Sequence, residues 1–204
     1  MRSPEEILLE AAERFDRIAI ACSFQKEASV VLDFASRIAG GRADLFDVFT
    51  LDTGVLFAET HEAWAAFERH YGMPIAGLRG EQPERLWETD PDGCCEARKV
   101  VPLRERLVGA DAWVTGVRRD QAATRANTEE ISWDEKYGLF KVAPLASWTE
   151  KDVWRHIHER GLPYHELHDR GYASIGCVPC TQPGEGREGR WAGRDKLECG
   201  LHAA

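Results

Sequence analysis

The sequence predicts an α/β fold built on a parallel, twisted sheet with helices on both faces. Short apolar segments alternate with stretches of helical spacing, which is the order expected of βαβ units. The apolar segments are nearly continuous, so both faces of the sheet are expected to be covered. With 204 residues, 43% of them hydrophobic, the chain is long enough for one substantial core.

The first half of the chain supplies two strands and three helices. Pro4 opens the first helix, because proline is favoured in a first helical turn and apolar residues follow at helical spacing. Glycines end the next two helices, at Gly40 and Gly72. The elements expected in order are a helix from about 4 to 15, a strand at 17–22, a helix at about 26–39, a strand at 45–51 and a helix at about 56–71.

The second half continues the alternation and then departs from it. Strands are expected at 73–78 and 111–117, with a helix carrying Leu103 and Leu107 between them, and a β-hairpin at about 130–145. A last helix opens with Ser147 or Thr149 as its cap and Glu150 in the first turn.

The C-terminal segment has a different character. From Thr181 onward, glycines alternate with charged residues and little core is expected. The sequence therefore predicts a nucleotide-binding domain over residues 1–180 and a flexible arm over residues 181–204.

The charge balance limits the classes of partner. A net charge of −9 argues against general nucleic-acid binding, which depends on clustered Lys and Arg. No stretch is long and apolar enough to span a bilayer, and the N-terminus lacks the apolar core of a signal peptide. A cytoplasmic protein is expected. In that reducing compartment, six cysteines favour metal ligands and redox thiols over disulfides.

Four of the cysteines form two short pairs, Cys94-Cys95 and Cys177-x-x-Cys180. Such pairs suit either an iron–sulfur cluster or a tetrahedral zinc ion, and their spacing alone does not choose between the two. Adjacent side chains on a regular helix diverge by about 100°. Cys94 and Cys95 are therefore expected to share one centre only where the backbone is irregular or the centre is large.

The other two cysteines stand alone. Cys199 lies outside both pairs with Lys196 and His202 nearby, so it is a candidate reactive thiol. Cys22 ends an apolar strand and is expected to be a small core residue.

Two polar turns follow the first two predicted strands. Ser23 to Ser29 opens a helix, where backbone N–H groups could face an anion, and Leu51 to Gly54 occupies the matching place after the next strand. Ligands of parallel sheets bind at the carboxyl ends of the strands. The two turns therefore predict a nucleotide pocket.

A specific resemblance rests on six segments taken together. They are Ser23–Ser29, Leu51–Gly54, Cys94–Lys99, Thr115–Gln121, Cys177–Cys180 and Glu198–His202. In this order, from about residue 17 to residue 202, they resemble the assimilatory adenylylsulfate reductases. That group of sulfonucleotide reductases has the adenine-nucleotide α-hydrolase-like fold. The resemblance implies reduction of adenosine 5′-phosphosulfate to sulfite and AMP, with thioredoxin as the electron donor and a Cys-S-sulfonate intermediate.

The resemblance also implies roles for individual residues. Cys199 is the nucleophile and His202 assists it, while one [4Fe–4S] cluster per subunit, rather than zinc, is implied for the two cysteine pairs. The cluster ligands are Cys94, Cys95, Cys177 and Cys180. The substrate-binding residues are Ser23, Phe24, Ser29, Leu51, Thr53, Gly116 and Arg118, with Arg187 and Arg190 over the phosphosulfate and Lys99 between cluster and substrate.

Two departures and several alternatives accompany the resemblance. Ala28 stands where relatives often carry an acidic residue, and the first turn lacks the glycine pair of ATP-cleaving relatives. A 3′-phosphoadenylylsulfate reductase would need an additional basic site for the 3′-phosphate. An ATP-using tRNA thiolase and a structural zinc module are weaker alternatives. The sequence leaves open a homo-oligomer, any redox role of the cluster and the thioredoxin docking surface.

Overall fold

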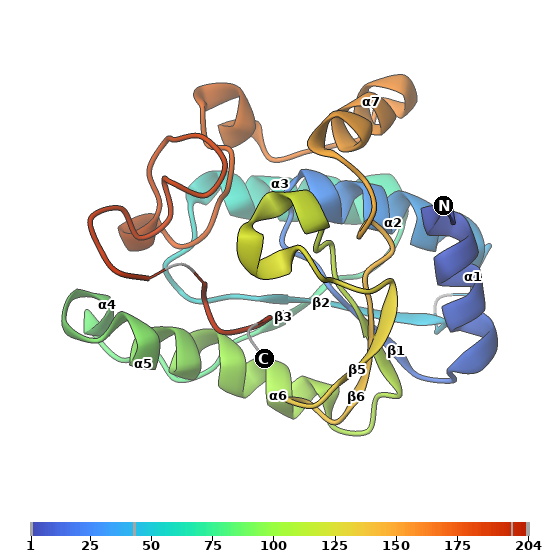
Figure 1. Ribbon diagram of the computed structural model, residues 1–204, viewed down its shortest axis with the longest axis horizontal. Coiled ribbons are helices and arrows are strands. Elements are labelled where there is room, and N and C mark those ends of the chain that lie inside the picture. The colour runs from blue at the N-terminus through green and yellow to red at the C-terminus, as the bar shows by residue number, and fades with distance from the viewer. Residues whose placement is uncertain (1, 43, 197, 203–204) are drawn as a thin grey trace.

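The computed structural model describes residues 2–42, 44–196 and 198–202. Its centre is a six-stranded sheet in the order β3-β2-β1-β4-β6-β5 (Figure 1). The strands are β1 (Ile18–Ala21), β2 (Phe46–Leu51), β3 (Ala76–Leu78), β4 (Ala112–Val114), β5 (Ile131–Asp134) and β6 (Leu139–Val142). All neighbours pair in parallel except β5, which runs antiparallel to β6. The predicted parallel sheet is therefore confirmed, and the expected hairpin forms its edge.

The helices begin and end where the local sequence favours it. They are α1 (Pro4–Arg14), α2 (Lys26–Ala39), α3 (Ala58–Tyr71), α4 (Leu86–Thr89), α5 (Pro91–Cys95), α6 (Val101–Leu107) and α7 (Glu150–Arg160). Thr149, rather than Ser147, caps α7, and its side chain accepts a hydrogen bond from the Asp152 N–H. Gly40 and Gly72 end α2 and α3 in the left-handed conformation, at φ 55° and 63°.

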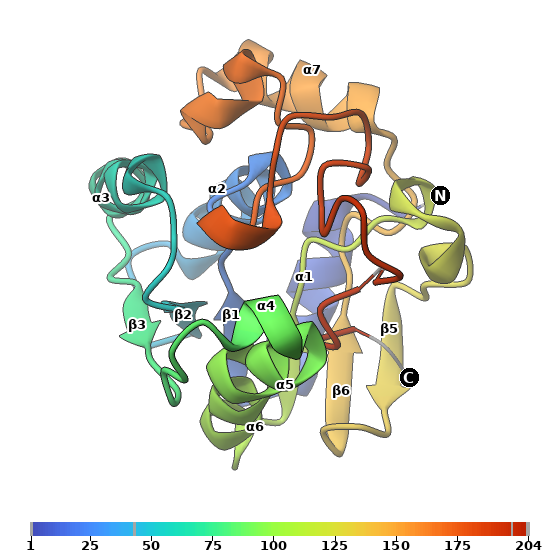
Figure 2. The ribbon, with the colours of Figure 1, turned by 90° about the vertical axis from the view of Figure 1, so that its left-hand side faces the viewer.

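Helices cover both faces of the sheet, as Figure 2 shows end-on. On β1, Ile18 and Ile20 belong to the larger apolar core, which also holds residues of α1, α2, α3 and α7. Ala19 faces the opposite side, where it packs with Leu103 and Leu107 of α6. The alternation along one four-residue strand therefore places one core on each face, as expected for a covered parallel sheet.

The helix that carries the first cysteine pair is irregular. Helix α5 ends at Cys95 and continues as a π-helical turn over Glu96–Val100 before α6 begins at Val101. Both Cys94 and Cys95 are buried. The irregular backbone that two adjacent ligands require is thus present directly beside them.

The described part of the C-terminal segment is folded against the body. A bridge pairs Thr181 with Arg190, and another pairs Tyr172 with Gly184. Trp191 is 3% exposed, so this segment buries more than the sequence predicted. Its mobility stays a prediction. Of residues 181–204, Leu197 and residues 203–204 lie outside the described part.

Across the described residues, no helix has the length and apolar character needed to cross a membrane.

Candidate active site

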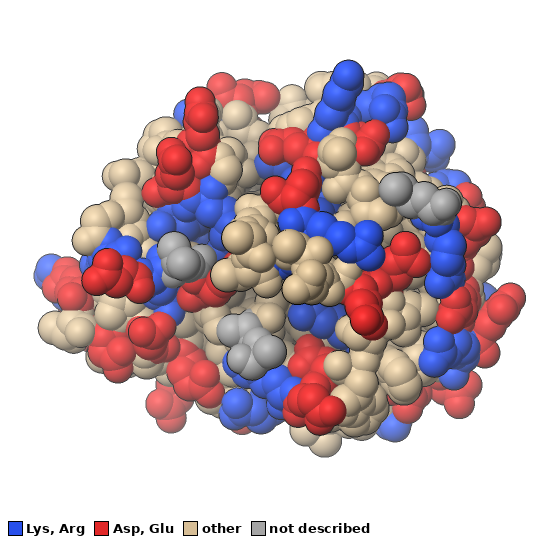
Figure 3. Space-filling model, in the orientation of Figure 1, with Lys and Arg blue, Asp and Glu red and all other residues tan. Residues whose placement is uncertain are grey.

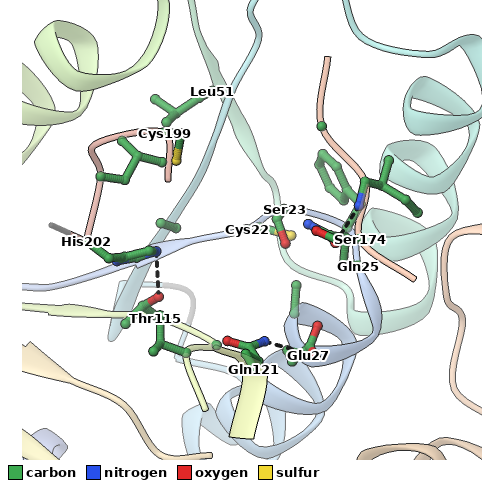
Figure 4. Close-up of a pocket in the computed structure, with 18 of the residues that line it drawn as sticks. Cys22, Ser23, Gln25, Glu27, Leu51, Thr115, Gln121, Ser174, Cys199 and His202 are labelled. Atoms are coloured by element: carbon green, nitrogen blue, oxygen red, sulfur yellow. Dashed lines mark hydrogen bonds between the residues drawn. The ribbon is translucent and has the colours of Figure 1, made fainter. Parts of the chain in front are cut away.

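A cavity of about 260 Å³ opens at the carboxyl ends of β1, β2 and β4 (Figure 4). Its position follows from the parallel sheet, because the turns after neighbouring strands meet at one edge. The sequence-predicted residues that line it are Ser23, Phe24, Leu51, Thr53, Lys99, Gly116, Arg118, Arg187, Arg190, Cys199 and His202. The residues that the sequence predicted for one site are far apart along the chain, and they line the same cavity.

The turn after β1 is held in an unusual backbone conformation. Phe24 has φ 58°, which non-glycine residues rarely adopt. Its ring is fully buried, stacked on Trp64 at 5.6 Å between centroids and edge-on to Phe67 at 5.5 Å. This aromatic packing fixes the turn and directs the backbone around Ser23 toward the cavity.

The start of α2 is tied to the segment that precedes the second cysteine pair. The Gln25 side chain accepts a hydrogen bond from the Ile175 N–H at 2.9 Å. Lys26 Nζ donates to the Ala173 carbonyl at 2.8 Å and pairs with Glu150 at 3.0 Å. The Lys26 ammonium group therefore stabilises the wall of the cavity through these two contacts.

The turn after β2 joins this cavity to the cysteines. Asp52 accepts a hydrogen bond from the Gly54 N–H at 2.9 Å, which closes the turn. Thr53 Oγ1 lies 3.3 Å from Cys177 Sγ, and the Arg98 guanidinium donates to the Thr53 carbonyl. This turn therefore contacts both the cavity and the second cysteine pair.

The turn after β4 needs a glycine. A Cβ at Gly116 would lie 2.8 Å from Glu27 Cβ of α2, so no larger residue fits without a shift. Arg118 is 2% exposed, and its guanidinium pairs with Glu27 at 3.1 Å and with Asp120. Arg118 lines the cavity, and its ion pair with Glu27 also connects the turn after β4 to α2.

Ser29 is the one predicted binding residue that does not line the cavity. It is fully buried on α2, where its hydroxyl contacts Tyr71 Oη at 2.6 Å and donates to the Pro163 carbonyl. The prediction of a substrate contact is therefore corrected to a structural one. The helix turns Ser29 inward, away from the edge of the sheet that Ser23 occupies.

The two cysteine pairs surround a second, small cavity. Cys94, Cys95, Cys177 and Cys180 all line it, and all four thiols are free. In the described part of the chain, no group of three or more His, Cys, Asp or Glu has the arrangement to hold a metal ion. The donor set nevertheless fits a thiolate-bound centre in its chemistry, because four soft ligands converge on one buried space.

Buried polar groups beside the cysteines support that fit. Trp191 Nε1 and Arg98 Nε are buried and have no hydrogen-bond partner among the described residues, and both side chains line the cysteine cavity. Donors without partners are costly inside a protein unless an acceptor is supplied. Sulfur atoms of a bound centre would be such acceptors.

Lys99 lies between the two cavities. Among the described residues it alone lines both, and it is 9% exposed. Burial opposes its charge, but the nearby thiols of Cys177 and Cys199 more than offset that effect and raise the pKa of Lys99. A permanent cation therefore stands between the cysteine pairs and the nucleotide cavity.

The arm brings Cys199 and His202 into the nucleotide cavity. Figure 4 shows the Cys199 thiol near Leu51. The His202 ring stacks on Trp113 at 5.3 Å, and its Nε2 lies 3.5 Å from Thr115 Oγ1. Burial, reinforced by Lys141 and Arg125, lowers the pKa of His202 well below its usual range. Its imidazole is therefore neutral at neutral pH, so the buried positive charge of this cavity comes from side chains such as Lys99.

Two arginines of the arm complete the cavity. Arg190 is 8% exposed; its Nη1 donates to Ser174 Oγ and to the Ile175 carbonyl, each at 3.2 Å. A Cβ at Gly176 would lie 2.4 Å from Arg190 Nη2, so this glycine makes room for the guanidinium. Arg187 Nη2 donates to Glu198 Oε2 at 3.0 Å.

Some residues of the site were missed by the sequence reasoning. Trp113, Thr115, Gln121, Arg125 and Glu198 had no assigned role. Thr115, Gln121 and Glu198 stand within the segments Thr115–Gln121 and Glu198–His202, which is the only signal that could have identified them. Cys22 is 4% exposed, and burial raises the pKa of its thiol to about 12, as suits a packing residue.

Positive charge is concentrated inside the cavity. Lys99, Arg187 and Arg190 line it within a chain whose net charge is −9. On the face shown in Figure 3, acidic and basic side chains are interspersed. A small anion would therefore find its cations in the cavity.

Comparison with known proteins identifies close relatives. A profile of the phosphoadenosine phosphosulfate reductase domain matches residues 17–183. The chain is 46% identical over 205 residues to a Geobacillus kaustophilus protein named adenosine 5′-phosphosulfate reductase, a match that covers 93% of this chain and 85% of the relative. A Bacillus subtilis protein named adenosine 5′-phosphosulfate reductase 1 is 43% identical over 201 residues, which cover 92% of this chain and 84% of that protein.

A solved structure has the same architecture. The phosphoadenylyl-sulfate reductase of Candida auris, in a phosphate complex, superposes with a TM-score of 0.78 at 27% identity, covering 89% of this chain and 91% of that one. The predicted α/β nucleotide-binding fold is thereby confirmed.

Proposed function

Because the chain belongs to the phosphoadenosine phosphosulfate reductase family, we propose that it reduces adenosine 5′-phosphosulfate to sulfite and AMP in sulfate assimilation. The observation that carries this proposal is the convergence of the Cys199 thiol with cationic side chains on a single cavity. Cys199, Lys99, Arg187 and Arg190 all line the cavity at the carboxyl ends of the strands. The two relatives described above, at 43% and 46% identity, carry the name of this activity.

The first step is a transfer of the sulfuryl group to Cys199. The thiolate attacks the sulfur of the sulfate, an S–S bond forms, and the bond between sulfur and the bridging phosphate oxygen breaks. AMP leaves with the electron pair of that bond, and the enzyme keeps a Cys-S-sulfonate. A thiolate is required because a neutral thiol is a poor nucleophile.

The cations of the cavity offset charge during this step. The substrate is anionic, and additional charge develops on the departing phosphate. Lys99 stays protonated because the Cys177 and Cys199 thiols outweigh its burial and raise its pKa. Arg190 is fixed by hydrogen bonds to Ser174 and Ile175. In this proposal, His202 orients the thiol as a neutral ring held against Trp113.

The second step needs a dithiol, for which we propose thioredoxin. Its thiolate attacks Cys199 Sγ, sulfite leaves with the electron pair of the S–S bond, and a mixed disulfide forms. The second thiol of thioredoxin then releases Cys199 and leaves oxidised thioredoxin. The two electrons that convert sulfate sulfur to sulfite thus come from the dithiol. This chemistry and the six free cysteines support a cytoplasmic location.

We also propose that the four paired cysteines hold one [4Fe–4S] cluster per subunit. Cys94, Cys95, Cys177 and Cys180 line one cavity beside the buried Lys99. When bound, the cluster supplies a fixed negative charge that Lys99 offsets. Iron and acid-labile sulfide near four of each per subunit would support the assignment. Stoichiometric zinc without sulfide would replace it with the zinc centre.

The substrate assignment has a direct test. The enzyme, purified without oxygen, is given thioredoxin, thioredoxin reductase and NADPH with each sulfonucleotide, and released sulfite is measured. We expect adenosine 5′-phosphosulfate to be turned over and the 3′-phosphorylated nucleotide to be a poor substrate. Preference for the 3′-phosphorylated nucleotide, or no sulfite from either, would overturn the assignment.

The covalent intermediate has a separate test. Enzyme incubated with ³⁵S-labelled adenosine 5′-phosphosulfate, without thioredoxin, should retain label on the peptide that contains Cys199. Added thioredoxin should release that label as sulfite. Labelling at another residue would show that the nucleophile is wrongly assigned.

A further inference from the structure

The residue before the proposed nucleophile is held by a group of charged side chains. Arg125 binds the Glu198 carboxylate with both of its edges: Nε lies 3.0 Å from Oε1 and Nη2 lies 2.8 Å from Oε2. Arg187 Nη2 donates to the same Oε2 at 3.0 Å, and Thr124 Oγ1 donates to Oε1 at 3.3 Å. We call Glu198 with Arg125, Arg187 and Thr124 the Glu198 clamp.

The clamp joins parts of the chain that are far apart in the sequence. Thr124 and Arg125 belong to a short 3₁₀ turn, Ala123–Arg125, that follows β4 on the body. Arg187 and Glu198 belong to two different parts of the arm. The clamp therefore fixes both parts of the arm to the body at one point, directly beside Cys199.

The clamp is shielded from water. The side chains of Arg125 and Glu198 are 10% and 13% exposed, and that of Arg187 is 20% exposed. Burial alone would raise the pKa of Glu198, but its hydrogen bonds and charge interactions with Arg125 lower it, so the carboxylate is ionised at neutral pH. Losing one partner of such a pair leaves the other charge buried, which is costly.

Contacts on the far side of Cys199 are also mostly polar. Lys136 Nζ donates to the Gly200 carbonyl at 2.5 Å, and Tyr137 Oη donates to the Leu201 carbonyl at 3.3 Å. Both side chains come from the turn between β5 and β6. These two contacts bind backbone carbonyls and do not depend on the side chains of Gly200 and Leu201, whereas the His202 ring stacks on Trp113. The clamp is thus the ion-paired side-chain contact directly beside the thiol.

We propose that Glu198 is a positioning residue, whose capture by Arg125 and Arg187 closes the arm and holds Cys199 in the cavity. Release of the carboxylate exposes the thiol to the protein reductant. This inference rests on the proposed function, because it assigns Glu198 to the first of the two steps described above. Sulfuryl transfer needs the clamp closed, whereas sulfite release needs it open.

Chemical modification of Cys199 tests the closed state without turnover. The cluster-loaded enzyme, free of substrate, is treated with iodoacetamide, and alkylation of the Cys199 peptide is followed by mass spectrometry. Glu198→Gln keeps the shape of the side chain but removes its charge. We expect alkylation to become at least about tenfold faster, the factor that corresponds to 1.4 kcal/mol.

A control and a double variant sharpen this test. Glu188→Gln makes the same change at an exposed position of the arm and should leave the alkylation rate at the wild-type value. Arg125→Gln should match Glu198→Gln, and the double variant should be no faster than either single one, because both disrupt one interaction. If Cys199 in Glu198→Gln is alkylated at the wild-type rate, the proposal about the clamp is wrong. It is also wrong if the effects of the two substitutions add fully in the double variant.

The two half-reactions separate positioning from a merely structural role. In Glu198→Gln, formation of the labelled S-sulfonate should slow by about tenfold or more. Release of sulfite by thioredoxin from enzyme that already carries the label should be as fast as in the wild type. Equal slowing of both steps would show that Glu198 acts only through stability.

These measurements also distinguish the two proposals. If the wild type forms no S-sulfonate while Glu198→Gln alkylates faster, the proposed function fails and the clamp stands. If the wild type forms the S-sulfonate but Glu198→Gln alkylates at the wild-type rate, the clamp fails and the proposed function stands.

Discussion

The sheet-centred body and the C-terminal arm are held in place by different kinds of contact. In the body, fully buried apolar side chains such as Leu32 and Phe67 pack into the core on one face of the sheet. In the described part of the arm, the contacts are mainly ion pairs and cations over an aromatic ring. Arg190 lies 4.5 Å from the centre of the Trp191 ring, and Lys196 pairs with Asp92.

The difference matters because the two kinds of contact respond differently to separation. Exposing apolar surface costs roughly 25 cal/mol per Å², so the body does not open without unfolding. Exposed ion pairs are typically worth about 0–1 kcal/mol, since water replaces the partner, and the less exposed Glu198 clamp costs more to separate. This difference supports the proposal that the body preserves the shape of the cavity while the arm leaves it and returns.

The largest effect is expected from the arm and should leave stability unchanged. Cys199→Ser replaces a thiol with a weak nucleophile, so sulfite formation should fall by more than about a thousandfold. The melting temperature should stay at the wild-type value, because the side chain contributes little to either core. Activity and thermal unfolding are measured on the same preparation. If this variant releases sulfite at the normal rate, the arm does not carry the nucleophile and the proposed division between body and arm is wrong.

The next effect belongs to the body. Leu32→Ala removes a fully buried side chain from α2, so we expect a loss of about 2–5 kcal/mol in the free energy of unfolding. Leu9, which is 44% exposed on α1, provides the matched control. Leu9→Ala should change stability by no more than about 0.5 kcal/mol. Urea denaturation measures both, and equal losses would contradict the assignment of the core.

A pH effect is expected where the body meets the segment leading to the arm. His165 is fully buried; its Nδ1 accepts from the Leu167 N–H at 3.3 Å, and its Nε2 lies 2.9 Å from Thr60 Oγ1. Burial lowers its pKa from 6.5 to about 4. Between these values the unfolded chain binds a proton that the folded protein does not, so stability falls as the pH is lowered from 6.5 to 4.

The size of that effect can be measured. At 1.36 kcal/mol per pKa unit, His165 should account for about 3 kcal/mol of stability that is present above pH 6.5 and lost by pH 4. His165→Gln should flatten this part of the pH profile of unfolding. An unchanged slope in the variant would show that His165 does not titrate differently in the folded state.

The smallest effect tests the contact between the two regions. Gly176→Ala would place a Cβ 2.4 Å from the Arg190 guanidinium, which must then shift. We expect the KM for the sulfonucleotide to rise by about tenfold, since a displaced charge-assisted contact is worth roughly 1.5–3 kcal/mol. The melting temperature should change little. An unchanged KM would indicate that Arg190 does not contact the substrate.

Much of the fold could be predicted because its signals are local. The apolar run at 17–22 and the glycines after α2 and α3 place β1 and two helix ends to within a few residues. The resemblance carried by the six segments is confirmed at the level of the family. The arm was predicted less well, because Trp191 is buried against the cavity that Cys94, Cys95 and Arg98 line, and no local pattern reveals packing against residues so far away in the sequence.

In the candidate site, too, residues in local motifs could be predicted and residues that depend on long-range contacts could not. Cys199 and the strand-end turns could be predicted because they stand in short motifs next to recognisable elements. The Glu198 clamp could not, since Arg125 and Glu198 are far apart in the sequence and each resembles an ordinary surface charge. Ser29 was predicted wrongly for a related reason. It belongs to a binding motif, but it lies on α2, on the side of the helix that faces the core.

The π-helical turn at Glu96–Val100 sets the orientation of two proposed cluster ligands independently of the sheet. Deleting one residue within it would restore regular turns and rotate Cys94 and Cys95 by about 100° relative to α6. Leu103 and Leu107 would keep their packing against the sheet, because they follow the deletion. We therefore expect one deletion to remove the proposed four-thiol site while the sheet and its packing are kept. The same deletion would also displace Lys99, which lies in this turn and lines both cavities, so it would test the proposed cluster site and the cation beside it together.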